Sequence, residues 1–436
     1  MLTAAASEPL IWDAAAETMP RERLADLQLE RLRETVVRVL KGQPLGARRL
    51  AEAGIEGPED IRTLDDLVEI PFAHKTDLRE HYPFGLLAVP REELVRVQAS
   101  SGSHGKPTVV GYTRADLEVW TEVMARSMTM AGVRPGMLIH NANGYGLFTG
   151  GLGFHQGGEQ IGATVVPVSG GFTGRQAMLL RDLGAHVLVA TPSYSLVIAQ
   201  ALRDAGFEPE DNTLELGLFG GEPWTEGLRT QIDRALGIKA INFYGLSEMC
   251  GPGVATECLT ARDGLHIQED HFLVEVIDPA DGTRLPPGSD GELVFTTLTK
   301  EALPLIRYRT GDLGAVTIEP CACGRTTARL IRLSGRRDDM MIIRGVNLYP
   351  SAVEHILMSA DGVAPHWRLI LERPGPMDEL TLECEPSALD GDRDSLRQTL
   401  ETHLKEGTGV RIAVSVLEPG SVPRSEGKAV RVVDRR

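Results

Sequence analysis

The chain has 436 residues, of which 42% are hydrophobic and 24% charged, and this composition excludes a disordered tail, a collagen-like repeat and a disulfide-rich miniprotein. At about 100–200 residues per domain, the length predicts two or three domains. The 61 Asp and Glu residues outnumber the 45 Lys and Arg residues and give a formal net charge of −16, so the surface repels nucleic acid and anionic lipid. We therefore expect neither nucleic acid nor a membrane as a partner.

The first forty residues lack the order of charges that a secretory signal needs, because Glu8 and Asp13 stand where a basic segment would be. No apolar run approaches the roughly 20 residues of a membrane span. The cysteines are odd in number and lie in the second half of the chain, which suits reduced thiols or a metal site better than a disulfide framework. They are Cys250, Cys258, Cys321, Cys323 and Cys384. We expect a cytoplasmic protein.

The first predicted element is an amphipathic helix over residues 22–41, where leucine and valine recur at helical spacing. From residue 95 to about 199, short runs rich in β-branched residues alternate with helical segments and are flanked by glycine turns. Strand-like segments at 214–220 and 239–245 continue the alternation. The order of strand, helix and strand predicts a largely parallel sheet that helices cover on both faces.

The pattern changes after residue 265, where hairpin-like segments predict an antiparallel addition to the sheet domain. Beyond a boundary at 335–345, helical and strand patterns alternate again and predict a small α+β domain. The chain is thus expected to be an α/β protein in three parts. These are a large domain over 1–334, a connecting segment over 335–345 and a small domain over 346–436.

A glycine-rich loop lies within residues 99–113, ASSGSHGKPTVVGYT. Small residues with unhindered N–H groups can surround an anion, and Lys106 adds a positive charge. A nucleotide-binding P-loop would lead into a helix after its lysine. Here Pro107 and a strand follow instead, and Gly102 lies only three residues before Gly105. This disfavours an ordinary P-loop. A flexible hairpin turn of small residues is the alternative for the loop taken alone.

Five segments in a fixed order are more specific than that loop. They read ASSGSHGKPTVVGYT, FYGLSE, IRYRTGDL, SGRRDDMMIIRG and PRSEGKAVRVVDRR. This series resembles the signature motifs of the AMP-forming adenylating enzymes. Segments such as HNANGYGLFTGG, YGLSEMCGPGVATEC and DDMMIIRGVNLYPSAVE are most similar to the phenylacetate–CoA ligases, over roughly residues 70–436.

The resemblance implies a large adenylate-forming domain, with helix-flanked sheets and a small antiparallel part, followed by a mobile α+β domain. It also implies a reaction in two steps. ATP and Mg²⁺ activate a carboxylic acid to an acyl-adenylate, and a thiol then displaces AMP. Both steps move charge between oxygen atoms, so the protein must mainly position groups and stabilise anions. CoA is the expected thiol.

By resemblance the glycine-rich loop holds the phosphates of ATP. The matching residues are Ser100, Ser101, Gly102, Ser103, Gly105 and Lys106. His104 stands where relatives usually have threonine and brings no hydroxyl, so its role is open.

Further residues match the nucleotide site by resemblance. Tyr244 offers a ring to adenine, Ser247 a hydroxyl to the α-phosphate and Glu248 a carboxylate to Mg²⁺. Asp312 would accept the ribose hydroxyls, and Arg336 would reach the ribose and phosphate. The remaining residues of this expected site are Gly221, Glu222, Pro223 and Gly245.

Three residues belong to the expected movement of the small domain. Asp338 corresponds to the hinge, and Gly345 to the glycine that lines the thiol tunnel after the domain rotates. Lys428 corresponds to the catalytic lysine, whose ammonium neutralises charge on the carboxylate and α-phosphate oxygens. Judged alone, Lys428 would be an ordinary exposed lysine near a chain end.

The acid is expected in a pocket beside the nucleotide. Its candidate wall residues are Asn143, Tyr145, Phe148, Gly150 and Gly221, next to Glu222 and Pro223. Asn143 stands where phenylacetate enzymes typically have tyrosine, and Gly221 where they have alanine. Both changes remove bulk, and the amide of Asn143 adds a donor and an acceptor. We therefore expect a hydroxy- or amino-substituted aryl acid.

A second cluster predicts a structural zinc site. Cys321 and Cys323 lie on one short turn, and Cys258 and His266 lie eight residues apart. Three thiolates and one imidazole complete a tetrahedral zinc site, and relatives with the same turn often carry the same Cys and His pair. The alternative is a set of buried thiols that pack as small apolar groups.

Several alternatives stay open at this point. The acyl acceptor is CoA or the phosphopantetheine of an acyl carrier protein, since the reacting arm is the same in both. A non-catalytic, zinc-containing scaffold is a remote alternative, against which Lys428, Glu248 and Asp312 speak together. A phosphate-loop kinase would make ADP instead of AMP. A homodimer is expected by resemblance only.

Overall fold

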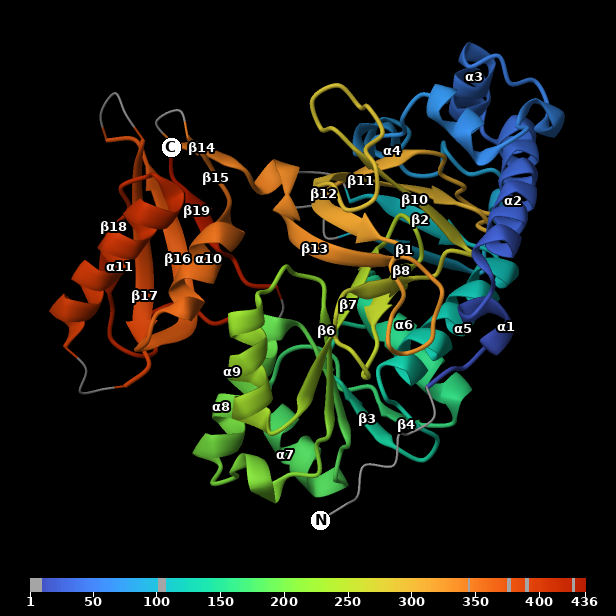
Figure 1. Ribbon diagram of the computed structural model, residues 1–436. Helices are drawn as coiled ribbons and strands as arrows, with labels where there is room; N and C mark the ends of the chain where they lie inside the picture. The colour runs from blue at the N-terminus through green and yellow to red at the C-terminus, as the bar shows by residue number, and fades with distance from the viewer. Residues whose placement is uncertain (1–9, 101–106, 344–345, 375–377, 389–391, 426–427) are drawn as a thin grey trace.

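The computed structural model describes residues 10–100, 107–343, 346–374, 378–388, 392–425 and 428–436. These residues form two lobes, on the right and left of Figure 1. We call the described residues up to 334 the large lobe and those from 346 onward the small lobe. Within this part of the chain, no helix is long and apolar enough to cross a bilayer.

One eleven-stranded sheet runs through the large lobe, in the order β10-β11-β12-β13-β9-β8-β7-β6-β5-β3-β4. Its parallel half is made of β3 (Leu138–Asn141), β4 (Thr164–Val166), β5 (Val187–Ala190), β6 (Leu216–Gly220) and β7 (Lys239–Leu246). Its antiparallel half is made of β8 (Gly251–Glu257), β9 (Leu265–Ile267), β10 (Phe272–Ile277), β11 (Gly291–Thr297), β12 (Tyr308–Thr317) and β13 (Arg329–Arg336). The direction changes between β7 and β8. The expected parallel sheet and hairpins are both present, and they form one continuous sheet.

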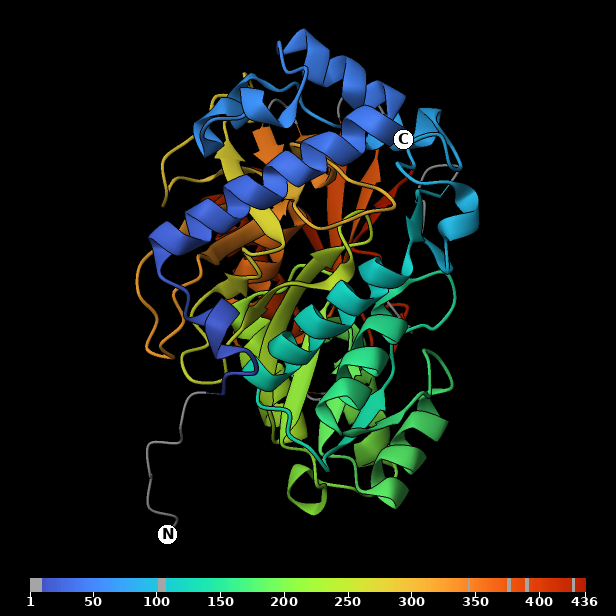
Figure 2. The same ribbon diagram turned by 90° about the vertical axis from the view of Figure 1, so that its right-hand side faces the viewer.

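Helices cover the parallel half on both faces, as the alternation of strands and helices predicts (Figures 1 and 2). One face carries α5 (Arg114–Met130) and α6 (Thr149–Ile161), and the other carries α7 (Thr173–Leu183), α8 (Pro192–Asp204) and α9 (Glu226–Leu236). Glycine lets α6 approach α5 closely: a Cβ on Gly157 would lie 2.6 Å from the Cβ of Met124. Each face therefore has its own apolar core.

The N-terminal helices pack on the antiparallel half. They are α1 (Ala14–Glu17), α2 (Arg21–Gly42), α3 (Pro44–Glu52) and α4 (Lys75–Glu80). The long helix α2 agrees with the expected 22–41 and crosses the molecule in Figure 2. Its buried residues Leu32, Val36 and Val39 form a core with Leu273 and Leu298.

Short elements complete the large lobe. The strands β1 (Arg96–Ala99) and β2 (Val109–Tyr112) pair antiparallel as a separate hairpin around the glycine-rich loop. The 3₁₀ turns are η1 (Pro58–Asp60), η2 (Leu64–Glu69), η3 (Arg91–Glu93), η4 (Pro209–Asp211) and, at the start of the connection between the lobes, η5 (Arg337–Asp339).

The small lobe has a sheet and a core of its own. The sheet has the order β18-β17-β16-β19. Its strands are β16 (Val363–Glu372), β17 (Glu379–Pro386), β18 (Ala413–Val416) and β19 (Val432–Asp434), and its helices are α10 (Pro350–Ser359) and α11 (Arg393–Thr408). A hairpin of β14 (Met341–Ile343) and β15 (Val346–Leu348) precedes them. Met341 and Ile343 pack into this core, although they lie within the expected connecting segment.

Candidate active site

Several described residues that the sequence assigns to the nucleotide and to catalysis lie near one another, because the charges of Glu222, Asp312 and Arg336 all act on Lys428 of the small lobe. Figure 1 shows the small lobe beside the large sheet. Tyr244 lies near the carboxyl end of β7, the last parallel strand. Asp312 and Arg336 lie opposite each other on β12 and β13. The carboxyl ends of parallel strands are where open α/β sheets bind their ligands.

A hydrogen-bond network joins these side chains. The Tyr244 hydroxyl donates to Oδ2 of Asp312 at 2.7 Å, and Nη1 of Arg336 donates to Oδ1 at 2.7 Å. Nη2 of Arg336 also donates to Asp338, at 3.0 Å. Burial raises the pKa of Asp312, and the neighbouring guanidinium of Arg336 opposes that rise. A carboxylate offers about four lone-pair directions, so Asp312 keeps acceptor capacity for a diol.

The packing around Tyr244 is tight and restricts which residues can stand next to it. The Tyr244 ring stacks on Phe295, with centroids 6.0 Å apart and an angle of 28° between the ring planes. A Cβ on Gly245 would lie 1.9 Å from the carbonyl oxygen of Gly251, so only glycine fits there. These contacts orient the segment that leads to Ser247 and Glu248.

Glu248 is 5% exposed and faces Tyr308. Burial, together with the charge of Glu248 and a hydrogen bond to it, raises the pKa of Tyr308. Ser247 is close behind, with its Oγ 3.5 Å from Oγ1 of Thr149. A carboxylate and a hydroxyl on one short segment are groups that can hold a divalent cation and a phosphate oxygen.

The buried cation of Lys300 supports this segment from the core. Its Nζ donates to the carbonyl oxygen of Met249 at 2.5 Å and lies 4.3 Å from the centroid of the Tyr112 ring. Burial lowers the pKa of Lys300, and the charges of Asp116 and Glu248 oppose that effect.

Lys428 extends from the small lobe toward this network. Desolvation lowers its pKa, while the carboxylates of Glu222 and Asp312 raise it and the cations Arg336 and Lys75 lower it further. Its Nζ lies 5.8 Å from the centroid of the Phe148 ring. The Lys428 side chain is exposed, but it lies close enough to Glu222 and Asp312 for their charges to act on its ammonium group. We call this junction between the lobes, around Lys428, Glu222 and Asp312, the cleft.

Gly221 and Glu222 line the same cleft, followed by the exposed Pro223. Gly221 has φ +85°, a conformation that favours glycine, and a Cβ on it would lie 3.6 Å from Cε of Lys428. The space left by the missing methyl group therefore adjoins the lysine. The Glu222 carboxylate accepts a hydrogen bond from the backbone N–H of Ala429 at 2.9 Å.

Polar side chains lie next to the residues of the expected acid pocket. The Asn141 amide donates to the Tyr145 hydroxyl at 2.8 Å, and Nδ1 of His155 lies 3.1 Å from that hydroxyl. Asn143 lies 3.6 Å from the position of a Cβ on Gly150. Phe148 is 38% exposed and presents its ring to the cleft beside Lys428.

Some expected site residues lie outside the described part of the chain. Ser100 is described, and its Oγ accepts a hydrogen bond from the backbone N–H of Thr108 at 3.3 Å. The others of the phosphate loop and the thiol tunnel fall outside the described residues. They are Ser101, Gly102, Ser103, His104, Gly105, Lys106 and Gly345.

Four residues that the sequence pattern did not single out also belong to the site. Thr149, Tyr308 and Lys300 contact the segment of Glu248, and Lys75 lies close enough to Lys428 to lower its pKa. Lys75 is the first residue of α4 and precedes the motifs by more than twenty positions. Tyr308 and Thr149 stand within the motifs IRYRTGDL and HNANGYGLFTGG, but their contacts with the segment of Glu248 join positions that are distant in the chain and could not be read from those motifs.

The four residues of the expected zinc site lie close together in the structure. One ligand atom from each of Cys258, His266, Cys321 and Cys323 lies within 4.8 Å of the others. Two zinc-bound sulfurs at about 2.3 Å from the metal would be about 3.8 Å apart. The Cys258 and Cys321 sulfurs are 3.8 Å apart, and Nε2 of His266 lies 3.3 Å from the Cys323 sulfur. The four residues fit a tetrahedral zinc ion.

The surroundings of the cluster also suit a metal. Nδ1 of His266 lies 3.1 Å from Oγ1 of Thr327, the kind of outer contact that orients a ligating imidazole. Hydrogen bonds from Cys258 and His266 lower the pKa of the Cys323 thiol, although its burial opposes them. A thiolate is the form that binds zinc.

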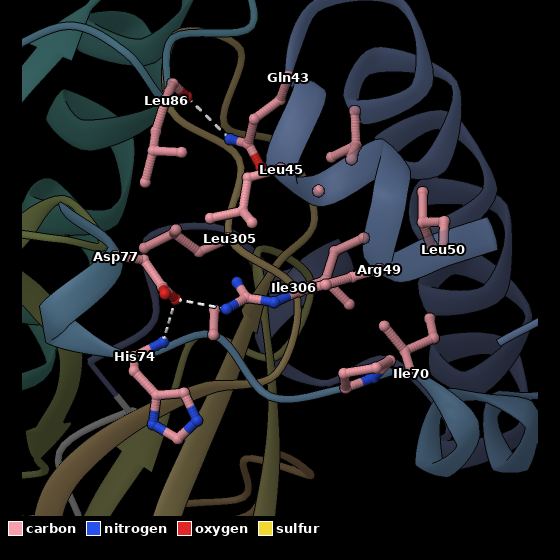
Figure 3. Close-up of a pocket in the computed structure, with 14 residues that line it drawn as sticks. Gln43, Leu45, Arg49, Leu50, Ile70, His74, Asp77, Leu86, Leu305 and Ile306 are labelled. Carbon is pink, nitrogen blue, oxygen red and sulfur yellow. Dashed lines mark hydrogen bonds and ion pairs between the residues drawn. The ribbon is translucent and has the colours of Figure 1, made fainter. Parts of the chain in front are cut away.

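A pocket between α3 and the segment of His74 lies apart from these sites (Figure 3). Its cavity volume is 20 Å³, room for about one or two water molecules. Arg49 and Asp77 pair across it at 2.8 Å, and Gln43 donates to the carbonyl of Leu86 at 2.8 Å. This pocket is too small for a nucleotide or an aryl acid.

Two family models match the chain. The AMP-binding enzyme family matches residues 87–298, and the AMP-binding enzyme C-terminal domain matches residues 345–436. A phenylacetate-coenzyme A ligase of Thermus thermophilus is 52% identical, over 98% of this chain and 100% of its own length. One of Escherichia coli is 47% identical, over 96% of this chain and 97% of its own length.

Solved structures of similar proteins are also CoA ligases, and they allow the arrangement of the lobes to be compared. A 2-hydroxyisobutyryl-CoA ligase with its acyl-AMP, in a postadenylation state, is 32% identical and superposes with a TM-score of 0.92, over 100% of this chain and 94% of the other. The same ligase in a thioesterification state, with CoA, reaches 0.73 over 98% and 92%. The lobes of this chain are therefore arranged as in the postadenylation state.

Proposed function

Because the chain belongs to the phenylacetate–CoA ligase family of AMP-forming adenylating enzymes, we propose that it activates a hydroxy- or amino-substituted aryl acid and transfers the acyl group to coenzyme A. The enzyme is an acid–thiol ligase. In the first step a carboxylate oxygen attacks the α-phosphorus of ATP, and pyrophosphate leaves. In the second step a thiol sulfur attacks the acyl carbon, and AMP leaves.

The observation that carries this proposal is the position of Lys428. Its ammonium enters the cleft between the lobes, near Asp312 and Glu222 and beside the Phe148 ring. At that position it can neutralise the negative charge that develops on the carboxylate and α-phosphate oxygens during adenylation. The similarity to a postadenylation state supports the same role.

The other described residues are proposed for complementary roles. Asp312 accepts the ribose hydroxyls, Arg336 orients Asp312 and reaches toward the ribose, and Tyr244 and Gly245 form the wall for adenine. Ser247 contacts the α-phosphate. Glu248 would hold Mg²⁺, which neutralises the phosphates when it is bound. The loop from Ser100 to Lys106 is proposed for the β- and γ-phosphates.

Lys75 gives additional support for an anion in the cleft. Like-charged groups repel one another, and Lys75 and Arg336 both lower the pKa of Lys428, although Asp312 and Asp338 pair with Arg336 and compensate part of its charge. A bound phosphate would relieve this repulsion. We therefore add Lys75 to the groups proposed to contact ATP or pyrophosphate.

The proposed polar substituent follows from the acid pocket. Asn143 brings an amide where a phenol would take up volume, and the neighbouring Asn141, Tyr145 and His155 form a polar network. Phe148 supplies an apolar ring for the aryl group. Glycine in place of alanine at position 221 widens the pocket less than the sequence comparison suggests, because the space that the missing methyl group leaves lies beside Lys428.

A panel of acids with chromatography of the nucleotide product tests the proposal. Phenylacetate, benzoate and their hydroxy and amino derivatives are each incubated with ATP, Mg²⁺ and CoA. We expect AMP and pyrophosphate, with the highest kcat/KM for a substituted acid. A clear preference for unsubstituted phenylacetate would refute the proposed substituent, and formation of ADP would refute adenylation.

The thiol acceptor is the second part of that experiment. Phosphopantetheine on a carrier protein presents the same arm as CoA, and the two differ only outside the tunnel. We expect faster turnover with CoA than with a carrier-bound arm. The reverse order would favour transfer to an acyl carrier protein.

We also propose the division of the chain into a large domain over 1–334, a hinge segment over 335–345 and a small domain over 346–436, with Gly345 in the thiol tunnel. Cys258, His266, Cys321 and Cys323 are proposed to hold a structural Zn²⁺. A homodimer and a cytoplasmic location stay predictions. Light scattering during gel filtration tests the first, and fractionation of cells the second.

A further inference from the structure

The carboxylate of Glu222 connects the two lobes beside the catalytic lysine. Its Oε1 accepts a hydrogen bond from the backbone N–H of Ser193, at 2.6 Å, in the large lobe. Its Oε2 accepts one from the backbone N–H of Ala429, at 2.9 Å, in the small lobe. Ala429 directly follows Lys428, so one side chain of the large lobe holds the backbone that carries the ammonium group.

The large lobe fixes this carboxylate by itself. Ser193 is the second residue of α8, a helix of 13 residues that begins after its N-cap Thr191. The free N–H groups and the positive end of a helix favour a carboxylate at this point. The anchor of Oε1 thus lies entirely within the large lobe, and Oε2 accepts the hydrogen bond from the small lobe.

The surroundings leave room for the lysine at this acceptor. Gly221, the residue before Glu222, has no Cβ, and a Cβ there would lie 3.6 Å from Cε of Lys428. The charge of Glu222 is also the largest favourable one near the ammonium and offsets part of its desolvation. The hydrogen bond to the backbone of Ala429, the space beside Gly221 and the charge of Glu222 thus all favour the observed position of Lys428.

Two further contacts between the described residues of the lobes lie away from the lysine. Nε2 of Gln231 lies 3.3 Å from Sδ of Met358, where α9 meets α10. The Ser351 hydroxyl donates to the carbonyl of Ser334 at 2.5 Å, next to the connecting segment. These contacts hold α10 against the large lobe, whereas the Glu222 contact acts on the segment that must reach the acyl phosphate.

We propose that Glu222 is a positioning residue for the adenylation step, whose carboxylate docks the backbone of Ala429 and thereby places the ammonium of Lys428, and that this hydrogen bond is broken when the small lobe moves for thioester formation. The inference rests on the proposed function and adds a role for the Glu222 side chain to the role of its backbone in the nucleotide site. It predicts that the two half-reactions respond differently to loss of the carboxylate.

The test compares Glu222→Ala, Glu222→Asp and wild type in each half-reaction. Adenylation is followed by pyrophosphate release in single-turnover experiments with the preferred acid. Thioester formation is followed separately, from chemically prepared acyl-adenylate and CoA. We expect Glu222→Ala to slow adenylation about 10- to 100-fold, an effect of misplacing a reacting group, and to leave thioester formation within about twofold.

Glu222→Asp separates docking from charge. Aspartate keeps the charge, but its shorter side chain does not span from Ser193 to Ala429. We expect it to slow adenylation nearly as much as alanine. If Asp restores the wild-type rate, the carboxylate acts only through its charge, and the proposed docking is wrong.

Glu226→Ala is the matched control. Glu226 is a carboxylate of the same lobe, four residues along the chain, 81% exposed and paired with Arg229. Its removal should leave both half-reactions unchanged. Thermal melting of all variants checks that they are folded.

Other outcomes overturn the inference without ambiguity. Equal rates of adenylation in wild type and Glu222→Ala, or equal losses in both half-reactions of a folded variant, exclude a positioning role in adenylation. If wild type itself makes no adenylate with any acid, the proposed function fails instead. The two failures are therefore distinguishable.

Discussion

At the scale of the residue, Lys428 is the side chain on which the chemistry depends most. It reaches the cleft from the small lobe and meets the carboxylates of Glu222 and Asp312. We predict that Lys428→Ala slows adenylation by about 100- to 1,000-fold, the usual loss when one stabilising donor is removed from a developing anion. Single-turnover pyrophosphate release measures this effect.

The same variant should make thioester from prepared acyl-adenylate at nearly the wild-type rate. Lys405→Ala is the control, because Lys405 is an exposed lysine on α11 of the same lobe. Unchanged pyrophosphate release in Lys428→Ala would remove this lysine from the mechanism.

Lys428, Asp312 and Glu248 could be assigned to the expected site from the sequence, because each stands in one motif of the ordered series. Contacts made across the fold were not predictable in the same way. The hydrogen bond from Tyr244 to Asp312 joins residues 68 positions apart, and that from Lys300 to Met249 joins residues 51 apart. Neither has a local pattern, because the partners meet only when β7, β12 and the loop after β11 are assembled.

At the scale of the element, the turn of Cys321 and Cys323 holds the N-terminal segment as well as the proposed zinc. Nε of Arg325, two residues on, donates to Glu17 at 2.6 Å, and the Thr326 hydroxyl donates to the carbonyl of Met19 at 2.7 Å. The Arg325 and Glu17 side chains are almost fully buried. These hydrogen bonds hold α1 and the residues before α2 against the turn, so an ordered turn also keeps this segment in place.

We predict that Cys323→Ser lowers the zinc content from about one ion per chain to well below one and lowers Tm by at least about 5 °C. Hydrogen exchange should rise in residues 10–20, since the turn that binds their backbone loses its anchor. Elemental analysis, melting curves and exchange mass spectrometry check the three effects.

Cys384→Ala serves as the comparison for this variant. Cys384 is buried in β17 of the small lobe, so its loss should cost stability without changing the zinc content. Zinc-free wild-type protein with an unchanged melting curve would contradict a structural metal.

The helix α10 carries a carboxyl group that makes stability depend on pH. Burial raises the pKa of Glu354 to about 7 from an ordinary 4.5, even though Arg431 opposes that rise. Nη2 of Arg431 lies 3.3 Å from Oε1 of Glu354. Between these two pH values the folded protein binds this proton more tightly than the unfolded chain does, so the contribution to stability is full below about pH 4.5 and is lost as the pH rises toward 7.

Glu354→Gln imitates the protonated carboxyl group at every pH. We predict that it matches wild type in Tm near pH 4.5 and is more stable above pH 7, by up to about 3 kcal/mol, since one pKa unit corresponds to about 1.4 kcal/mol. Melting curves across this range test the sign. A variant that is less stable than wild type at pH 8 would contradict the raised pKa.

Periodicity predicted the elements well where packing follows the local pattern. The helix expected over 22–41 is α2, and the expected strand 239–245 is β7. Spacing alone did not reveal that β9 would pair with both β8 and β13. These pairings depend on the register between distant segments and not on the period within one segment, so periodicity could not reveal them.

At the scale of the whole molecule, the structure has one arrangement of two lobes, and we expect thioester formation to use a second one. The TM-score is 0.92 to a 2-hydroxyisobutyryl-CoA ligase in a postadenylation state and 0.73 to the same ligase in a thioesterification state, so the lobes are arranged more as in the former. Asp338 lies in η5, shortly before the first strand that packs in the small core, and we predict that a few dihedral angles there turn the lobe.

We predict that Asp338→Pro keeps adenylation within about fivefold of wild type and slows thioester formation more than about 100-fold, because proline fixes φ at a point that must rotate. The two half-reactions are measured separately. Asp338→Ala is the control: it removes the contact with Arg336 but leaves φ free. Equal effects of proline and alanine would exclude rotation at this residue.

The sequence predicted two domains and a connection between them, but not which way they face. The arrangement depends on a few polar contacts, such as those of Glu222 and Ser351, and on the meeting of Met358 with Gln231. Such contacts leave no pattern of hydrophobicity in the sequence, because they join surface groups of two lobes that each have a core of their own.

The separate core of the small lobe has a thermodynamic consequence. Trp367, Leu369 and Leu382 are buried within that lobe and not against the large one, so reorientation moves a finished body and exposes little apolar surface. Hydrogen bonds lost at the seam are replaced by water at a net loss of about 1 kcal/mol each. We therefore expect the two orientations to differ little in free energy, so that the binding and release of ligands can shift the population between them.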